Sequence, residues 1–379
     1  MSTHCFSKLS VIFLALLATS WAQSNTPAAA VALEQKGDLP QAARAWRSFI
    51  AAHPRDAEAY ASLGVVLAKQ QKYPEAAAAY KKALSLDPRL PSIEMNLGLA
   101  EFKQGHFHAA IAPLKAVAAR DAGNFQAHTL LGLSYYGDKQ YGKAIESLQV
   151  AVQADPSNVE LRQIVAQSCL WAGQYQCALD GFRQILMSQP NSAAAHVLIG
   201  EALDGLGKTP EAIAEFQQAA QVSPHEPNVH FGLGFLYWKS QDYGKAKAEF
   251  HAELASHADS AQAWAYLGDT EMKLGNRELA ASALNKAIQL QSDIRLAYLD
   301  RGILLSEGNK HKDAIADFRK AIELDPGQPD AHYRLARAYQ ALGESNEAER
   351  EFKRVQQLRQ ELDTRLTPKM SSAPPALRP

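Results

Sequence analysis

The sequence predicts an all-α fold, a linear array of stacked helix hairpins. A small residue, usually Gly, recurs every 34 positions along the chain. An Ala stands twelve residues after each of these small residues, and a bulky apolar residue stands sixteen residues after it. With 47% hydrophobic and 21% charged residues, the composition excludes a disordered or collagen-like chain. One hairpin cannot bury its own apolar faces, so neighbouring hairpins must stack.

Three sets of residues carry this period, and no insertion interrupts them. The small residues are Gly64, Gly98, Gly132, Gly200, Gly234, Gly268 and Gly302, with Ala30, Ala166 and Ala336 at the remaining points. The Ala set is Ala42, Ala76, Ala110, Ala144, Ala178, Ala212, Ala246, Ala280, Ala314 and Ala348. The bulky set is Trp46, Tyr80, Leu114, Leu148, Phe182, Phe216, Phe250, Leu284, Phe318 and Phe352.

The first element in chain order is a leader at residues 1–22. Lys8 precedes an apolar stretch, Leu9 to Ala18, and Ser20 and Ala22 supply the small residues that a signal peptidase requires. The alternative is a membrane anchor, but the stretch is about half of the roughly 20 residues that a spanning helix needs. We therefore expect a signal peptide cleaved before Gln23, a mature chain without a transmembrane segment, and a periplasmic or secreted location.

The second repeat shows why each repeat is expected to fold as a helix hairpin. At about 100° per residue, its first half places one apolar stripe on a helix: Tyr60, Leu63, Gly64 and Leu67. Its second half places another: Ala76, Tyr80 and Ala83. Pro74 stands at the start of the second helix, where Pro is tolerated best. The small residue is expected to face the Ala where the two helices come closest, with the bulky residue beside them.

This pattern resembles the tetratricopeptide repeat family, whose small, aromatic and Pro positions recur with the same period. The resemblance implies a right-handed superhelical solenoid of about ten antiparallel helix hairpins. The repeats are expected at 23–56, 57–90, 91–124, 125–158, 159–192, 193–226, 227–260, 261–294, 295–328 and 329–362. The first repeat departs most from the pattern, because it contains Pro27 and a run of Ala.

The last repeat is expected to close the array. Its second helix keeps Phe352, Val355 and Leu358 on one side and charged residues on the other. The remaining residues, 363–379, contain four Pro and are predicted to form a disordered tail.

The sequence offers no catalytic, cofactor or metal site. Gly207, Lys208 and Thr209 end a segment similar to a phosphate-binding loop, but they lie in an interhelix turn instead of after a strand. Four histidines occupy the fourth position of their repeats, which spreads them apart as packing residues: His128, His196, His230 and His332. The net charge of −1 leaves no excess of positive charge for nucleic acid. We therefore expect a protein that is not an enzyme and has no cofactor.

The first helices carry apolar residues on the face that points away from their partner helices. In tetratricopeptide proteins this concave face binds peptides, so the resemblance implies a groove. Its residues would be Met95, Leu99, Phe102, Leu133, Tyr136, Leu170, Trp171, Phe231, Phe235 and Trp238. The alternative is that superhelical coiling buries them as packing residues. A second candidate patch, with basic side chains, consists of Tyr333, Arg334 and Arg337.

Only Cys169 and Cys177 would remain after removal of a leader that contains Cys5. They stand on the two helices of one hairpin, roughly level across the turn at Gly173. An oxidising compartment would permit a disulfide between them. Two buried free thiols are the alternative, since Cys169 also occupies a normal packing position.

Together these expectations describe a non-enzymatic scaffold of the exported bacterial type, which binds a partner protein or peptide in a concave groove. An accessory subunit of an envelope enzyme or of a polysaccharide-export complex is the alternative. Only 39 residues lie outside the repeats, too few for a catalytic domain. The sequence leaves the partner's identity and the oligomeric state open.

Overall fold

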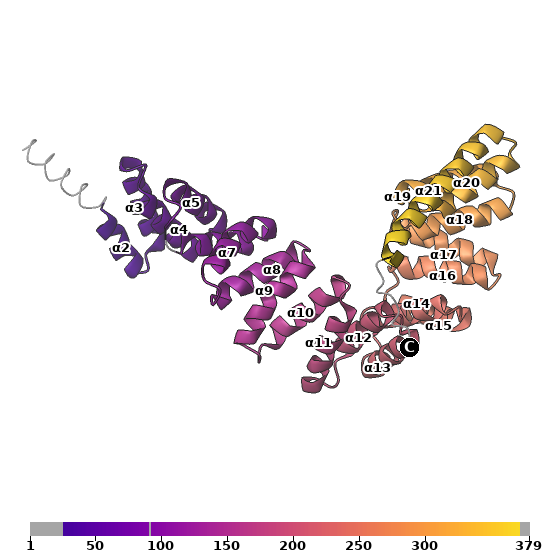
Figure 1. Ribbon diagram of the computed structural model, residues 1–379, viewed down its shortest axis with the longest axis horizontal. Helices are drawn as coiled ribbons and strands as arrows, with labels where there is room; N and C mark the ends of the chain where they lie inside the picture. Colours follow the sequence, from indigo (N-terminus) through magenta and orange to yellow (C-terminus); the bar gives the residue numbers. More distant parts are fainter. Residues whose placement is uncertain (1–25, 91, 372–379) are drawn as a thin grey trace, which may run out of the picture. The chain divides into compact units, whose positions relative to one another are not determined.

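The computed structural model describes residues 26–90 and 92–371, and within them it contains 20 helices and no strand. The chain divides into two compact units, unit 1 at residues 1–185 and unit 2 at residues 186–379. Within each unit, successive helices pack side by side as antiparallel hairpins (Figure 1). The predicted fold class, an all-α solenoid of helix hairpins, is confirmed. The predicted leader lies outside the described residues.

The helices follow one another with short turns. Unit 1 contains α2 (Pro27–Gln35), α3 (Leu39–Ala52), α4 (Ala57–Lys69), α5 (Tyr73–Leu86), α6 (Ile93–Lys103), α7 (Phe107–Arg120), α8 (Phe125–Gly137), α9 (Tyr141–Ala154), α10 (Val159–Trp171) and most of α11 (Tyr175–Ser188). Unit 2 contains α12 (Ala193–Gly205), α13 (Thr209–Val222), α14 (Val229–Lys239), α15 (Tyr243–Ser256), α16 (Ala261–Lys273), α17 (Arg277–Leu290), α18 (Arg295–Glu307), α19 (His311–Leu324), α20 (Pro329–Ala341) and α21 (Ser345–Ser371).

The first helix of several repeats begins directly after a polar residue, which is the last residue of the preceding repeat. The side chains of Asp56, Asn124, Asn158, Ser192 and Ser260 each accept a hydrogen bond from the backbone N–H three residues later. These bonds satisfy donors that the first turn of a helix leaves unpaired. In these five hairpins the repeat pattern therefore includes the signal that starts the first helix.

The interhelix turn explains the segment that is similar to a phosphate-binding loop. Gly207 lies between α12 and α13 with a φ of 73°, a left-handed conformation that Gly adopts without strain. The same position of other repeats is also left-handed, and it is Gly37, Gly105, Gly173, Gly275 and Gly343 in five of them. Gly207 therefore closes a hairpin and does not follow a strand.

The periodic small residues let the bulky residues lie over the first helices. A Cβ atom added at Gly64 would contact the Tyr80 ring, and one added at Gly268 would lie 2.6 Å from Cγ and Cδ2 of Leu284. We expected the small residue to face the Ala, but its nearest neighbour is the bulky residue. The bulky side chain itself fills the space above the small residue, while the Ala set is buried around it.

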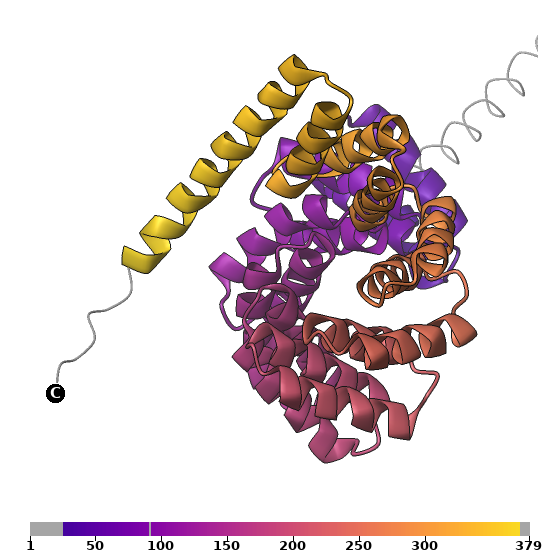
Figure 2. The same cartoon turned by 90° about the vertical axis from the view of Figure 1, so that its right-hand side faces the viewer.

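Helix α21 corrects the predicted boundary of the C-terminal tail. It runs for 27 residues, from Ser345 to Ser371, as one continuous helix (Figure 2). Residues 363–371, which were predicted to be disordered, therefore belong to a helix, and 372–379 lie outside the described residues. The physical reason is that no Gly or Pro interrupts residues 345–367, so the helix can propagate beyond its last packing residue.

Candidate peptide-binding site

In unit 2, the three predicted groove residues lie on α14 and form an aromatic cluster with Tyr266 of α16. Phe235 stacks on Trp238 with ring centroids 5.9 Å apart, and both rings meet Tyr266 at steep angles, at 5.5 and 5.2 Å. Phe231 lies 5.8 Å from the same Tyr266 ring. All four side chains are half-buried. We call these four residues the aromatic surface.

A buried carboxyl pair holds Trp238 in place. The indole N–H of Trp238 donates a 2.5 Å hydrogen bond to Oδ2 of Asp269, and Nζ of Lys273 lies 3.8 Å from Oδ1 of the same carboxylate. Asp269 and Asp300 are each 4% exposed. Burial, and then the negative charge of Asp269, raise the pKa of the Asp300 carboxyl well above its usual range. Trp238 is therefore fixed by a polar network as well as by ring contacts.

A pocket of about 370 Å³ opens beside the aromatic surface. It is lined by Glu201 and Asp204 of α12, Phe216 of α13, and Asn228, Phe231, Gly232, Phe235 and Leu236 of α14. Phe216 and Leu236 are buried and form its base. Pockets for small ligands and side chains combine such apolar walls with a few polar groups. We call it the acidic pocket.

The late start of α14 exposes the polar end of this pocket. Helix α14 begins at Val229, the third position of its repeat, whereas α12 and α16 begin at the first. The preceding residue, Asn228, has a φ of 65°, and its side chain does not cap the helix. Instead, the backbone N–H of Phe231 donates to Oε2 of Glu253, a buried residue of α15, at 3.2 Å. The Asn228 amide thus remains available to a ligand.

The two carboxylates of the acidic pocket differ in their partners. Nζ of Lys239 bonds Oδ1 of Asp204 at 2.7 Å. Glu201 forms no hydrogen bond or ion pair among the described residues, and burial raises the pKa of its carboxyl group. Glu201 and Asp204 occupy the ninth and twelfth positions of their repeat, as do seven of the ten predicted groove residues. The sequence analysis missed Glu201 and Asp204 because it considered only apolar side chains. Their positions in the repeat could have identified them.

In unit 1, predicted groove residues form a separate aromatic cluster. The rings of Tyr136 and Trp171 stack with centroids 5.4 Å apart, and Tyr141 lies 5.1 Å from Trp171. The hydroxyl of Tyr136 donates to Gln167 Oε1 at 3.0 Å. Trp171 is 51% exposed, so this cluster presents an aromatic face to solvent.

The other predicted groove residues of unit 1 divide between surface and core. Met95, Leu99, Phe102 and Leu133 are half-buried. Three of them, Met95, Phe102 and Leu133, pack against the core around α7, α8 and α9. Leu170 is buried and only 8% exposed, so it offers little surface to a ligand, in contrast to the prediction that it lines a groove. The burial follows from the position of its helix, since α10 packs on α9.

The second candidate patch lies on α20. Tyr333 is exposed and its ring lies 6.0 Å from that of Phe352. Arg337 donates to Gln340 Oε1 at 3.0 Å, and Arg334 is exposed. Other residues line five of the best-formed pockets of the described part of the chain. The patch is therefore a positively charged surface that does not enclose a ligand.

The periodic histidines form a repeated contact instead of a metal site. Nδ1 of His196, His230 and His332 each lies 2.6 to 2.7 Å from a Glu carboxylate 19 residues later on the second helix of the same repeat. Each pair links the two helices of a hairpin. Neither ring nitrogen of His128 has a hydrogen-bond partner. Within residues 26–90 and 92–371, no group of His, Cys, Asp or Glu side chains is arranged to hold a metal ion.

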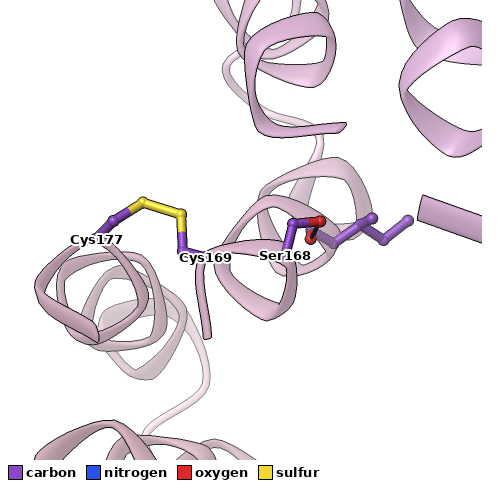
Figure 3. The surroundings of a disulfide bond; sticks show 4 residues. Ser168, Cys169 and Cys177 are labelled. Carbon is purple, nitrogen blue, oxygen red and sulfur yellow. Dashed lines mark hydrogen bonds between the residues drawn. A yellow bond between two sulfur atoms is a disulfide. The ribbon is translucent and has the colours of Figure 1, made fainter. Parts of the chain in front are cut away.

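A disulfide joins the two helices of the fifth repeat (Figure 3). It links Cys169 of α10 to Cys177 of α11, whose Cα atoms lie 5.7 Å apart. This distance is within the range that disulfides require. The adjacent Ser168 is buried and donates to the carbonyl oxygen of Ile164 at 2.7 Å, within its own helix.

Known proteins resemble parts of this chain. The chain is 29% identical to DnaJ homolog subfamily C member 3 of Homo sapiens over 99 residues, 26% of this chain and 20% of that protein. It is 38% identical to Protein O-mannosyl-transferase TMTC3 of Homo sapiens over 82 residues, 21% of this chain and 9% of that protein. The matches thus span a fifth or less of these relatives. A solved tetratricopeptide repeat protein from Parabacteroides merdae aligns with 74% of this chain and 98% of its own length, at 15% identity and a TM-score of 0.47.

Family models match most of the chain. One model described as a tetratricopeptide repeat matches residues 15–91, 95–159 and 231–293, and a second matches 135–202 and 304–366. A third, described as a TPR repeat, matches 205–241. None of the described helices is both long and apolar enough to cross a membrane. The periodic packing residues, the hairpins that they form and these matches agree: the chain belongs to the tetratricopeptide repeat family.

Proposed function

We propose that this protein is a non-enzymatic scaffold that binds an extended segment of a partner protein on the aromatic surface of unit 2. The tetratricopeptide fold is that of a protein–protein interaction scaffold. The observation that carries the proposal is the enclosure of this surface: the half-buried rings of Phe231 and Phe235 on α14 line a pocket of about 370 Å³. A helix face that only meets solvent would carry polar residues there.

Two features of the surface suit a peptide. Aromatic side chains supply large apolar contact areas and are enriched among the residues that dominate binding energy at interfaces. The Asn228 amide has both donors and an acceptor, so it can bond the backbone of an extended segment. A partner would thus gain apolar contacts and a backbone anchor from one helix, α14.

We expect peptides selected from a random display library on the intact protein to bind through this surface. Phe235→Ala should weaken their binding about fivefold or more, because truncation of an aromatic anchor typically costs more than about 1 kcal/mol. Fluorescence anisotropy of labelled peptides measures the affinity, and circular dichroism verifies that the variant is folded.

Lys286→Ala serves as the matched control, since Lys286 is exposed on the outer helix α17 of the same unit. It should leave the affinity unchanged. If selected peptides bind folded Phe235→Ala as tightly as the parent, the aromatic surface is not the site. The patch of Tyr333, Arg334 and Arg337 is then the next to test.

We propose further that the protein is exported to the periplasm or the extracellular space. The apolar stretch from Leu9 to Ala18 with the small residues before Gln23 supports this, and so does the disulfide, which oxidising compartments favour. The intact mass of protein from its own host should correspond to a chain that starts at Gln23.

Alkylation of the unfolded, unreduced protein should label no cysteine. A mass that retains residues 1–22, or two labelled cysteines, would contradict the proposal.

A further inference from the structure

The acidic pocket contains one carboxylate without a partner. Among its charged lining residues, Asp204 is paired with Lys239, whereas Glu201 has no cation within the described residues. Glu201 and Asp204 lie one turn apart on α12, so both face the same side of that helix. With two carboxylates and one ammonium group, the pocket keeps an uncompensated negative charge.

Aromatic side chains surround the pocket in which Glu201 lies. The base of the pocket is the buried Phe216 ring, and the Phe231 and Phe235 rings line the side formed by α14. Gly232 permits this closeness, because a Cβ atom there would overlap the Phe216 ring. Glu201 itself is exposed, so its carboxylate is open to a ligand, and burial of part of the side chain raises its pKa.

The chemistry of this lining selects among side chains that could enter. An acidic side chain would be repelled by Glu201. A purely apolar side chain would remove water from Glu201 without replacing its hydrogen bonds, which is unfavourable for a charged group. A planar cation can stack on aromatic rings and bond a carboxylate through two N–H groups at once.

We propose that the acidic pocket binds an arginine side chain of the partner segment. The guanidinium group pairs with Glu201, and its stem and planar face lie against Phe231 and Phe235. This inference rests on the proposed function, since it assigns the chemistry of one residue in the segment that the aromatic surface holds. The partner segment must then carry a positive charge at this position, in addition to the apolar side chains that contact the aromatic surface.

The test uses three pools of labelled, capped heptapeptides that are random except for a central arginine, citrulline or glutamate. Citrulline has nearly the shape of arginine but no charge. On the intact protein, the arginine pool should bind at least about fivefold more tightly than the citrulline pool, as for a partly desolvated cation beside aromatic rings. The glutamate pool should bind more weakly than both. Anisotropy titrations give the three affinities.

Two Glu→Gln variants assign the preference to one carboxylate. Glu201→Gln should reduce the ratio between the arginine and citrulline pools to about one, and it removes no hydrogen bond of the fold. Glu211→Gln removes the same charge from the exposed start of α13 in the same unit and should keep the ratio. The comparison separates local recognition from the net charge of the protein.

The outcomes distinguish this inference from the function on which it rests. If the arginine and citrulline pools bind equally, and both lose affinity with Phe235→Ala, the surface binds peptides but the arginine pocket is refuted. If Glu201→Gln keeps the full arginine preference, the cation binds elsewhere, and the inference fails as well. If no pool binds detectably, the inference and the proposed function fail together.

Discussion

Gly268→Val is expected to lower the melting temperature of unit 2 by about 2 to 12 °C. A Cβ atom at this position would stand 2.6 Å from two carbon atoms of Leu284, whose side chain is fully buried between α16 and α17. Extra carbon atoms in a packed core cost about 1 to 3 kcal/mol and occasionally more. For a unit of this size, each kcal/mol corresponds to about 2 to 4 °C. Thermal melts followed by circular dichroism measure the shift.

Gly244→Val is the matched control. Gly244 is also helical and belongs to the same unit, but a Cβ atom there would meet only the Asp242 carboxylate, at 3.9 Å. Both variants replace a helical Gly of unit 2 by Val, but only the substitution at Gly268 introduces a clash. A melting temperature of Gly268→Val equal to that of Gly244→Val would mean that the periodic glycines do not set the hairpin packing.

Trp238→Ala is expected to destabilise unit 2 by about 3 kcal/mol, in contrast to the nearly unchanged stability that a pure binding residue would show. The substitution removes ring contacts with Phe235 and Tyr266. It also removes the indole N–H that donates to the buried carboxylate of Asp269. Urea unfolding of the two proteins measures the difference in the free energy of unfolding.

Two further variants separate these causes. Trp238→Phe keeps an aromatic ring but loses the donor, so its loss of stability should be about 1 to 2 kcal/mol, the cost of an unsatisfied buried group. Trp171→Ala in unit 1 removes a half-exposed ring with no hydrogen bond to a buried acid, and should cost less than about 1 kcal/mol. If Trp238→Phe is as stable as the parent, the Asp269 bond contributes nothing to stability.

The consequence for binding experiments is that Trp238 is a poor probe of the proposed site. A variant that loses stability also loses affinity, because a smaller fraction of the protein is folded. Glu201 and Phe235 are better probes. Among the described residues Glu201 makes no hydrogen bond or ion pair, and Phe235, unlike Trp238, has no bond to a buried acid.

The sequence could not show which of the predicted groove side chains are accessible, and the structure gives their exposure residue by residue. Leu170 is buried, and Trp171 beside it is exposed. Trp238 is half-buried: it bonds Asp269, and part of its ring is accessible to solvent. Positions on a helix predict which side chains point away from the partner helix. They do not predict how closely the next repeat approaches, because that depends on the side chains of both repeats.

The sequence by itself determined the hairpins and their period. Small, Ala and bulky positions such as Gly268, Ala280 and Leu284 act within one repeat, so their spacing is enough to place two helices against each other. The tertiary structure alone decided that Asp269 and Asp300 bury their carboxyl groups together and that Glu201 has no ion-pair or hydrogen-bond partner within the described residues. These properties arise from contacts between repeats, where burial and the distance between charges depend on packing that no single repeat encodes.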